Sequence, residues 1–121
     1  MENFQLVRPE HLNHYGYLFG GNMLKWVDES AYMTARLEYP DFEFVTVALN
    51  RVEFNQPVDV GSILKFDVQR SRLGSSSVDY TVTVREDGNI KSLGVVLFST
   101  VITFVSIGHE GNSVALPRDK P

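Results

Sequence analysis

Only one segment of this sequence has the pattern of a long helix, and the segments around it have the pattern of strands. In residues 22–39 the apolar side chains spread over most of a helical circumference, and Pro40, which follows, cannot continue a helix. Four polar residues fall on one narrow stripe: Asn22, Lys25, Glu29 and Arg36. We therefore expect a helix at 22–39 that is buried nearly all round.

Five segments rich in β-branched and aromatic residues are predicted as strands: 4–8, 43–57, 63–72, 77–86 and 92–107. Turn signals separate the last four, at 59–61, 73–76 and 86–89. The nearly apolar stretch 95–105 predicts a strand in the middle of the sheet with both faces covered. One long helix wrapped by one curved antiparallel sheet, in the order β-α-β-β-β-β, is an α+β architecture.

The length of 121 residues, 43% of them in the hydrophobic set, predicts a single domain over residues 1–121 with a sizeable core. Eleven Lys and Arg face fifteen Asp and Glu without a basic run, which argues against nucleic acid or an anionic membrane as partner. The absence of cysteine excludes a disulfide framework, a thiolate zinc site and a thiol nucleophile. The sequence has neither the pattern of a signal peptide nor that of a membrane span. We therefore expect a soluble, cytoplasmic protein with no membrane insertion.

Asp28 departs from the polar stripe of the predicted helix and points toward its apolar side. An ionised carboxylate removed from water is destabilising by several kcal/mol unless it is paired or hydrogen-bonded. Two interpretations remain. Asp28 is a general base or nucleophile that lines a pocket, or it is a structural tie to a strand backbone or to an arginine, for which the candidates are Arg8, Arg51 and Arg70.

Two glycines, Gly20 and Gly21, precede the predicted helix. The first N–H groups of a helix are unpaired donors at the positive end of its dipole, and they can hold a carbonyl oxygen that gains negative charge. Asp28 lies about 10 Å of axial rise beyond Gly21, so the donors and the carboxylate can face one extended substrate. The structural alternative for the glycines is close packing of the loop on the sheet.

The segment 11–31, HLNHYGYLFGGNMLKWVDESA, resembles the signature of the hotdog-fold acyl-CoA thioesterases, in the group of bacterial and brain-type acyl-CoA hydrolases. That pattern is Asn-x-x-Gly-x-x-(Phe/His)-Gly-Gly followed by an acid within the central helix. The matching residues here are Asn13, Gly16, Phe19, Gly20, Gly21 and Asp28. Further similarity lies in VTVALNRVEFNQPVDVGSIL at 45–64, SRLGSSSVDYTVTV at 71–84 and TFVSIGHEGNSVALPR at 103–118, so the resemblance covers nearly the whole chain.

This resemblance implies a hotdog fold and the hydrolysis of an acyl-CoA thioester to a carboxylic acid and free CoA. It implies that Asp28 is the catalytic acid, acting either as general base or as nucleophile. It also implies that the Gly21 backbone N–H polarises the thioester carbonyl. Asn13 matches an asparagine that completes the active site, often from the other subunit of a dimer.

The resemblance also implies where the substrate binds. Gly20 matches a substrate contact, the turn residues Gly74, Ser75 and Ser76 match contacts to CoA, and Arg118 matches a position near phosphate. Relatives pair into dimers that often assemble further, so a homodimer, tetramer or hexamer is expected. No cofactor is expected. The sequence departs from the family pattern at His11, Asn50 and Arg51, which affects the choice of substrate more than the type of reaction.

Two other functions stay open at this point. One is a non-catalytic module that binds acyl-CoA or an acyl chain and in which Asp28 serves structure. The other is a hotdog hydratase or dehydratase, which is disfavoured because those relatives carry a different arrangement of acid and histidine. His11 and His14 lie three residues apart in a predicted loop without a third ligand nearby, so no metal site is expected.

Overall fold

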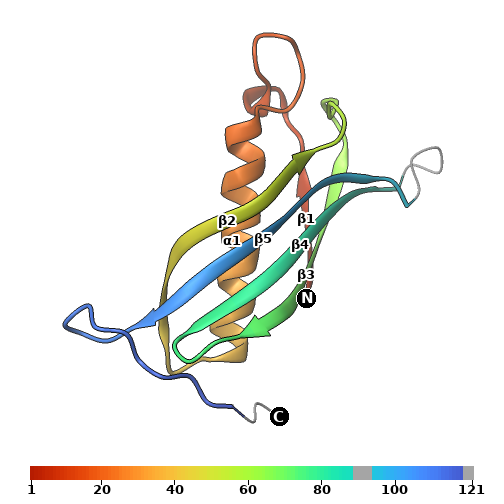
Figure 1. Cartoon of the computed structure of the whole chain (residues 1–121). Helices are drawn as coiled ribbons and strands as arrows, with labels where there is room; N and C mark the ends of the chain where they lie inside the picture. Colours follow the sequence, from red (N-terminus) through yellow and green to blue (C-terminus); the bar gives the residue numbers. More distant parts are fainter. Residues whose placement is uncertain (89–93, 119–121) are drawn as a thin grey trace.

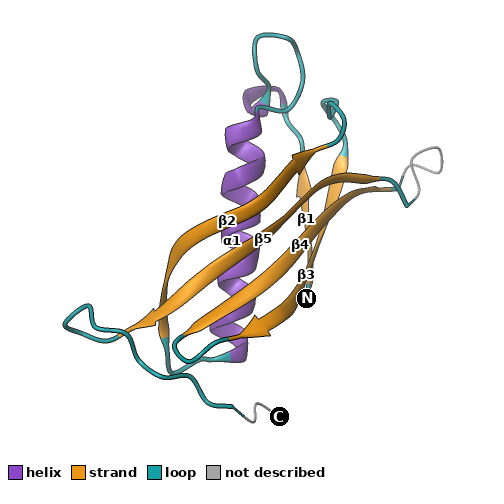
Figure 2. Ribbon diagram, viewed as in Figure 1, coloured by secondary structure: helices purple, strands orange, loops and turns teal. Residues whose placement is uncertain are grey.

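The computed structural model describes residues 1–88 and 94–118 of the chain (Figure 1). The elements in chain order are β1 (Glu2–Leu6), the short 3-10 helix η1 (Pro9–His11), α1 (Gly20–Glu38), β2 (Glu43–Phe54), β3 (Ile63–Leu73), β4 (Ser77–Asp87) and β5 (Val96–Ile107). The strands form one antiparallel sheet in the order β1-β3-β4-β5-β2. Figure 2 shows α1 running along one face of this curved sheet. The predicted α+β architecture and the predicted order of elements are confirmed.

The core lies between α1 and the sheet. The helix residues that recur every three or four positions are buried: Met23, Trp26, Val27, Ser30, Ala31, Thr34 and Ala35. Ala31 and Ala35 are fully buried, and their small side chains let the helix backbone come close to the strands. Trp26 packs edge to face on Phe66 of β3, with ring centroids 6.4 Å apart. This burial fixes the position of α1 on the sheet.

The opposite face of α1 is not covered within one chain, so the expectation of a helix buried nearly all round is wrong. Leu37 is 70% exposed and Met33 is 43% exposed. A single sheet face can contact only part of a helical circumference, and the apolar residues on the other side therefore stay in solvent. They form an apolar surface that a second chain can cover.

The sheet has β1 and β2 at its edges and β5 inside, between β4 and β2, as predicted for the apolar strand. From Phe98 onward the residues of β5 alternate between buried and half-buried, so the expectation that both of its faces are covered is wrong within one chain. The predicted strand at 43–57 ends at Phe54, and the predicted strand at 4–8 lies at Glu2–Leu6. Residues 92 and 93 of the last predicted strand, and residue 89 of the third predicted turn, lie outside the described residues.

The pairing of β2 with β5 is interrupted by two irregularities, one between residues 46 and 48 and one between residues 50 and 53. Within the second, Arg51 has a φ of 54°, in the left-handed region that non-glycine residues rarely adopt. The Thr100 hydroxyl of β5 donates a hydrogen bond to the Asn50 carbonyl oxygen at 2.8 Å. The bulged strand bends along its length, which increases the curvature of the sheet edge around α1.

The end of α1 is tied to the sheet by two side-chain hydrogen bonds. The Tyr80 hydroxyl donates to the Glu38 carboxylate at 2.8 Å, and the Arg70 guanidinium donates to the Tyr39 hydroxyl. Burial raises the pKa of Tyr80 well above its ordinary value, so this phenol remains protonated and keeps its donor. The end of the helix is therefore held by side chains, whereas its start has no side-chain cap.

Candidate active site

The start of α1 is formed by the two glycines themselves. Gly20 and Gly21 are the first two residues of the helix, two positions earlier than predicted. Phe19 precedes them in an extended conformation, and its carbonyl accepts the N–H groups of Asn22 and Met23 at 3.0 and 3.3 Å. The N–H groups of Gly20 and Gly21 have no preceding turn to bond to. They are backbone donors at the positive end of the helix dipole.

Both glycines lie beneath aromatic rings. A Cβ atom on Gly20 would lie 3.4 Å from the Phe54 ring, and a Cβ atom on Gly21 would lie 2.6 Å from the Phe19 ring. Phe54 is 54% exposed and Phe19 is 55% exposed. A side chain at Gly21 would displace the Phe19 ring, and a side chain at either position would narrow the approach to the backbone donors.

Asn13 organises the loop that precedes the helix. Its side-chain oxygen accepts hydrogen bonds from the N–H groups of Tyr15 at 2.9 Å and Tyr17 at 3.2 Å. The His11 carbonyl accepts the Phe19 N–H at 2.9 Å, which attaches the loop to the helix start. Because the Asn13 oxygen is used inside the loop, its amide NH₂ is the group that can donate to a ligand.

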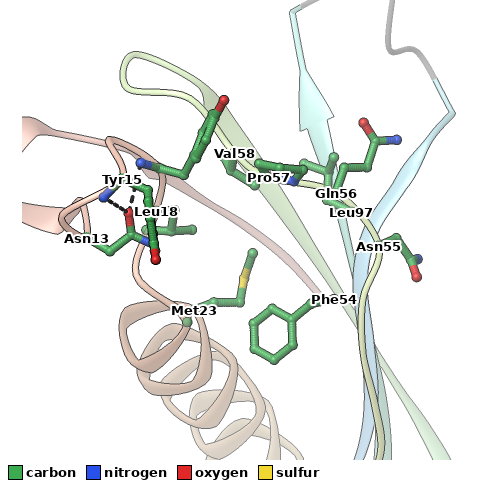
Figure 3. Close-up of a pocket in the computed structure, with 12 residues that line it drawn as sticks. Asn13, Tyr15, Leu18, Met23, Phe54, Asn55, Gln56, Pro57, Val58 and Leu97 are labelled. Carbon is green, nitrogen blue, oxygen red and sulfur yellow. Dashed lines mark hydrogen bonds between the residues drawn. The ribbon is translucent and has the colours of Figure 1, made fainter.

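A pocket of about 600 Å³ opens between this loop, the helix start and the end of β2 (Figure 3). Among the residues that the structure describes, its lining is mostly apolar and includes no charged side chain: Asn13, Tyr15, Tyr17, Leu18, Gly20, Met23, Phe54, Asn55, Gln56, Pro57, Val58 and Leu97. The structure therefore brings two of the predicted site residues, Asn13 and Gly20, to one cavity.

Asp28 lies further along α1, half-buried, in a separate shallow cleft of about 250 Å³ toward β2. The Thr46 hydroxyl donates a hydrogen bond to the Asp28 carboxylate at 2.7 Å. Within the described residues, no ion pair joins Asp28 to Arg8, Arg51 or Arg70, and Arg70 donates to Tyr39 instead. Asp28 thus keeps contact with solvent and has a neutral hydroxyl as its partner.

Gly74, Ser75 and Ser76 form the turn between β3 and β4, and Arg118 lies against them. The Arg118 guanidinium donates to the Gly74 carbonyl oxygen, and the Ser75 carbonyl accepts the Leu116 N–H at 2.9 Å. This turn lies near the end of α1, whereas Gly20 lies at its start (Figure 1). A helix of 19 residues spans about 28 Å. One chain therefore does not bring the predicted CoA contacts to the glycines.

Three residues that lie next to the predicted site residues were not predicted from the sequence. They are Thr46 beside Asp28, Phe54 beside Gly20 and Phe19 beside Gly21. Phe19 belongs to the quoted motif but carries no chemistry of its own that would single it out. Thr46 and Phe54 lie in a predicted strand, and strand alternation would normally tell which side chains face the helix. The two irregularities in β2 break that alternation, so the sequence holds no simple signal for either residue.

Two further properties of the described residues bear on the site. No group of three or more His, Cys, Asp or Glu side chains is placed there to bind a metal ion. Within the same residues, 1–88 and 94–118, no helix is long and apolar enough to cross a membrane.

Comparison with known proteins places this geometry in a family. Residues 15–93 match the model of the thioesterase superfamily. The chain is 31% identical over 80 residues to acyl-coenzyme A thioesterase 11 of Mus musculus, covering 66% of this chain. It superposes with a TM-score of 0.88 on an acyl-CoA hydrolase of Staphylococcus aureus solved with butyryl coenzyme A, coenzyme A and coenzyme A disulfide, at 28% identity, over 97% of this chain and 71% of that one. For a hexameric broad-specificity acyl-coenzyme A thioesterase the TM-score is 0.81 at 27% identity, over 97% of this chain and 80% of that one.

The chain spans only 13% of the length of the mouse protein and 18% of the length of an acetyl-coenzyme A thioesterase of Rattus norvegicus. The solved structures, by contrast, match it from end to end, and they confirm the hotdog fold. The family model covers more than half of the sequence and includes the glycines, Asp28 and the turn at 74–76. The chain belongs to the thioesterase superfamily.

Proposed function

We propose that this protein hydrolyses acyl-CoA thioesters to a carboxylic acid and free CoA. The observation that carries the proposal is the start of α1, where two glycine N–H groups without helical partners lie on the helix that also carries the accessible carboxylate of Asp28. Membership of the thioesterase superfamily supports the same reaction. The Staphylococcus aureus hydrolase, which is described in complex with butyryl coenzyme A, supports an acyl-CoA as the substrate.

In the proposed reaction, the thioester carbonyl oxygen accepts a hydrogen bond from the Gly21 N–H. This donor stabilises the negative charge that the oxygen gains when a water adds to the carbonyl carbon. Asp28 accepts the proton of that water as the carbon–oxygen bond forms. The carbon–sulfur bond then breaks, and the proton passes to the CoA thiolate, giving the acid and the thiol.

The spacing along α1 favours Asp28 as a general base over Asp28 as a nucleophile. Asp28 lies seven positions after Gly21, an axial rise of about 10 Å. The Asp28 side chain leans back toward the helix start, but a gap remains between its oxygens and a carbonyl held at Gly21. Direct attack requires the carboxylate oxygen to lie about 3 Å from the carbon, whereas a general base can act through water across a wider gap. The Thr46 hydroxyl holds the carboxylate by a hydrogen bond and so restricts its orientation.

We further propose that a complete site is shared between chains. The turn at 74–76 and Arg118 lie at the opposite end of α1 from the glycines, so CoA bound at that turn reaches the glycines only on another chain. Alanine mutants of the Staphylococcus aureus hydrolase include an asparagine and an aspartate separated by the same interval as Asn13 and Asp28. This supports Asn13 and Asp28 as site residues, and the hexameric relative supports a homo-oligomer.

The test of the activity is an assay of the purified protein against a panel of acyl-CoAs, with free thiol followed over time. Steady thiol release that depends on enzyme concentration is the expected result. Binding of acyl-CoA without turnover would overturn the proposal in favour of a binding module. A change in enoyl absorbance without thiol release would overturn it in favour of a hydratase or dehydratase.

A further inference from the structure

We infer that the pocket beside Gly20 binds the acyl chain of the thioester, and that Phe54, Met23 and Leu97 determine the chain length it accepts. The inference rests on the proposed function, because that function places the thioester carbonyl at the start of α1. It adds which part of the substrate fills the cavity and which side chains determine the length of the acyl chain.

The lining of the pocket identifies the class of its occupant. No lining residue within 1–88 and 94–118 is charged, and the volume of about 600 Å³ lies within the range of small-molecule sites. The phosphates of CoA need cationic or backbone donors, and Arg118 lies on Gly74 at the far end of α1. The nucleotide end of CoA is therefore directed elsewhere, and an uncharged, mostly apolar group is the occupant that fits this cavity.

The pocket reaches one of the two backbone donors at the helix start and lies next to the other in the sequence. Gly20 lines the cavity, and the Phe54 ring lies within 3.4 Å of the point where a Gly20 Cβ would be. An acyl chain that leaves a carbonyl held at Gly21 therefore enters the pocket across Gly20, beside the Phe54 ring. Asn13 lines the same cavity, so its amide NH₂ lies near this passage.

Three apolar side chains bound the space beyond this passage. Met23 and Leu97 are almost fully buried, at 2% and 4% exposure, so they form a fixed floor. The Phe54 ring is more exposed but packs edge to face on Phe98, with centroids 4.8 Å apart. In Figure 3 the Met23 and Phe54 side chains enter the space between the helix start and the strands. Each acyl methylene that reaches them leaves water and strengthens binding about fourfold.

The test compares Phe54→Ala with Phe4→Ala. Phe4 is a matched control because it is 52% exposed and lies on β1, at the other edge of the sheet from Phe54 on β2. The measured quantity is the ratio of kcat/KM for octanoyl-CoA to kcat/KM for butyryl-CoA. We expect Phe54→Ala to lower this ratio at least about tenfold, because the added methylenes lose contact with the ring, and Phe4→Ala to leave it unchanged. Leu97→Val, a change of one methylene in the core, should move the preferred chain length upward.

The same ratio is measured as binding affinity by calorimetry in the Asp28→Asn protein, where hydrolysis is not needed. An equal change for all chain lengths and for free CoA would mean that the pocket holds the pantetheine arm, and this would overturn the inference while hydrolysis still stands. If wild type hydrolyses no acyl-CoA but Phe54→Ala lowers the ratio of affinities, the acyl pocket stands and the proposed hydrolysis falls.

Discussion

Asp28 accepts its hydrogen bond from a threonine hydroxyl, and this partner decides what a substitution does. The Thr46 hydroxyl can donate to an amide oxygen as well as to a carboxylate, so Asp28→Asn leaves no orphaned group and removes only the capacity to accept a proton. We expect kcat to fall by at least about 10², with a melting temperature unchanged or slightly raised. Both are measured on one sample, with Asp41→Asn, an exposed carboxylate outside the site, as control. Full activity with a lowered melting temperature would assign Asp28 a structural role.

Arg118 provides a second test at the residue scale. If its guanidinium meets a phosphate of CoA, Arg118→Ala removes binding that is equal in the ground and transition states. KM for acyl-CoA should then rise with little change in kcat, and Arg118→Lys, which keeps the charge, should lie between the two. Steady-state kinetics at two salt concentrations checks this, because exposed charges are screened by salt. An unchanged KM in the alanine variant would remove Arg118 from the site.

At the same scale, the spacing of the motif predicted that Asn13 and the glycines lie together, and the structure brings Asn13 and Gly20 to one cavity but places Asp28 in a separate cleft. The catalytic roles of these residues stay predictions. The motif did not predict Thr46, whose place opposite Asp28 depends on how a strand bends. Nor did it predict that the side-chain oxygen of Asn13 would be used inside its own loop. The contact between Thr46 and Asp28 is long-range and arises from tertiary packing, which residue spacing alone does not encode, whereas the Asn13 contacts are local and span two and four residues.

The strand β2 carries the least regular geometry of the described elements. Arg51 has a φ of 54° inside its second irregularity, and a left-handed conformation is destabilising by about 1 kcal/mol or more for a residue with a Cβ atom. Arg51→Gly should therefore raise the melting temperature by a few degrees, after part of the gain is offset by the greater backbone entropy of glycine. Val52→Gly is the matched control next to it, and it should lower the melting temperature. Thermal unfolding followed by circular dichroism would contradict this if both variants were destabilised alike.

At the scale of elements, the positions of the strands were predicted better than the burial of α1. Strand propensity and turn signals placed the five strands within a few residues, because those signals are local. The extent of burial was predicted less well, since the apolar pattern of α1 includes Leu37 and Met33, which the sheet does not cover. An apolar pattern identifies the surface that is to be buried, and it does not say whether the same chain buries it.

At the scale of the whole molecule, the uncovered helix face and the long edge strand β2 both favour association with another chain. Val45 and Val47 are exposed along that edge, and an edge strand offers unpaired backbone groups to another chain. We expect a homo-oligomer, and light scattering at micromolar concentration should give a mass of at least twice the 13.7 kDa of the chain. A stable monomer with full activity would contradict both the oligomer and a site shared between chains.

A shared site makes a stronger prediction for mixed oligomers. Asn13→Ala and Asp28→Ala should each be inactive alone. If Asn13 of one chain completes the site that contains Asp28 of another, a mixed dimer of the two variants has one intact site and one doubly altered site. Equal mixing should then restore about a quarter of the wild-type activity per chain, because half of the dimers are mixed. Subunit exchange is monitored independently with fluorescent labels on the two variants. Complete exchange of subunits without recovery of activity would show that Asn13 and Asp28 act within the same chain. The predicted CoA contacts at 74–76 would then have to reach the glycines through a different arrangement of the chains.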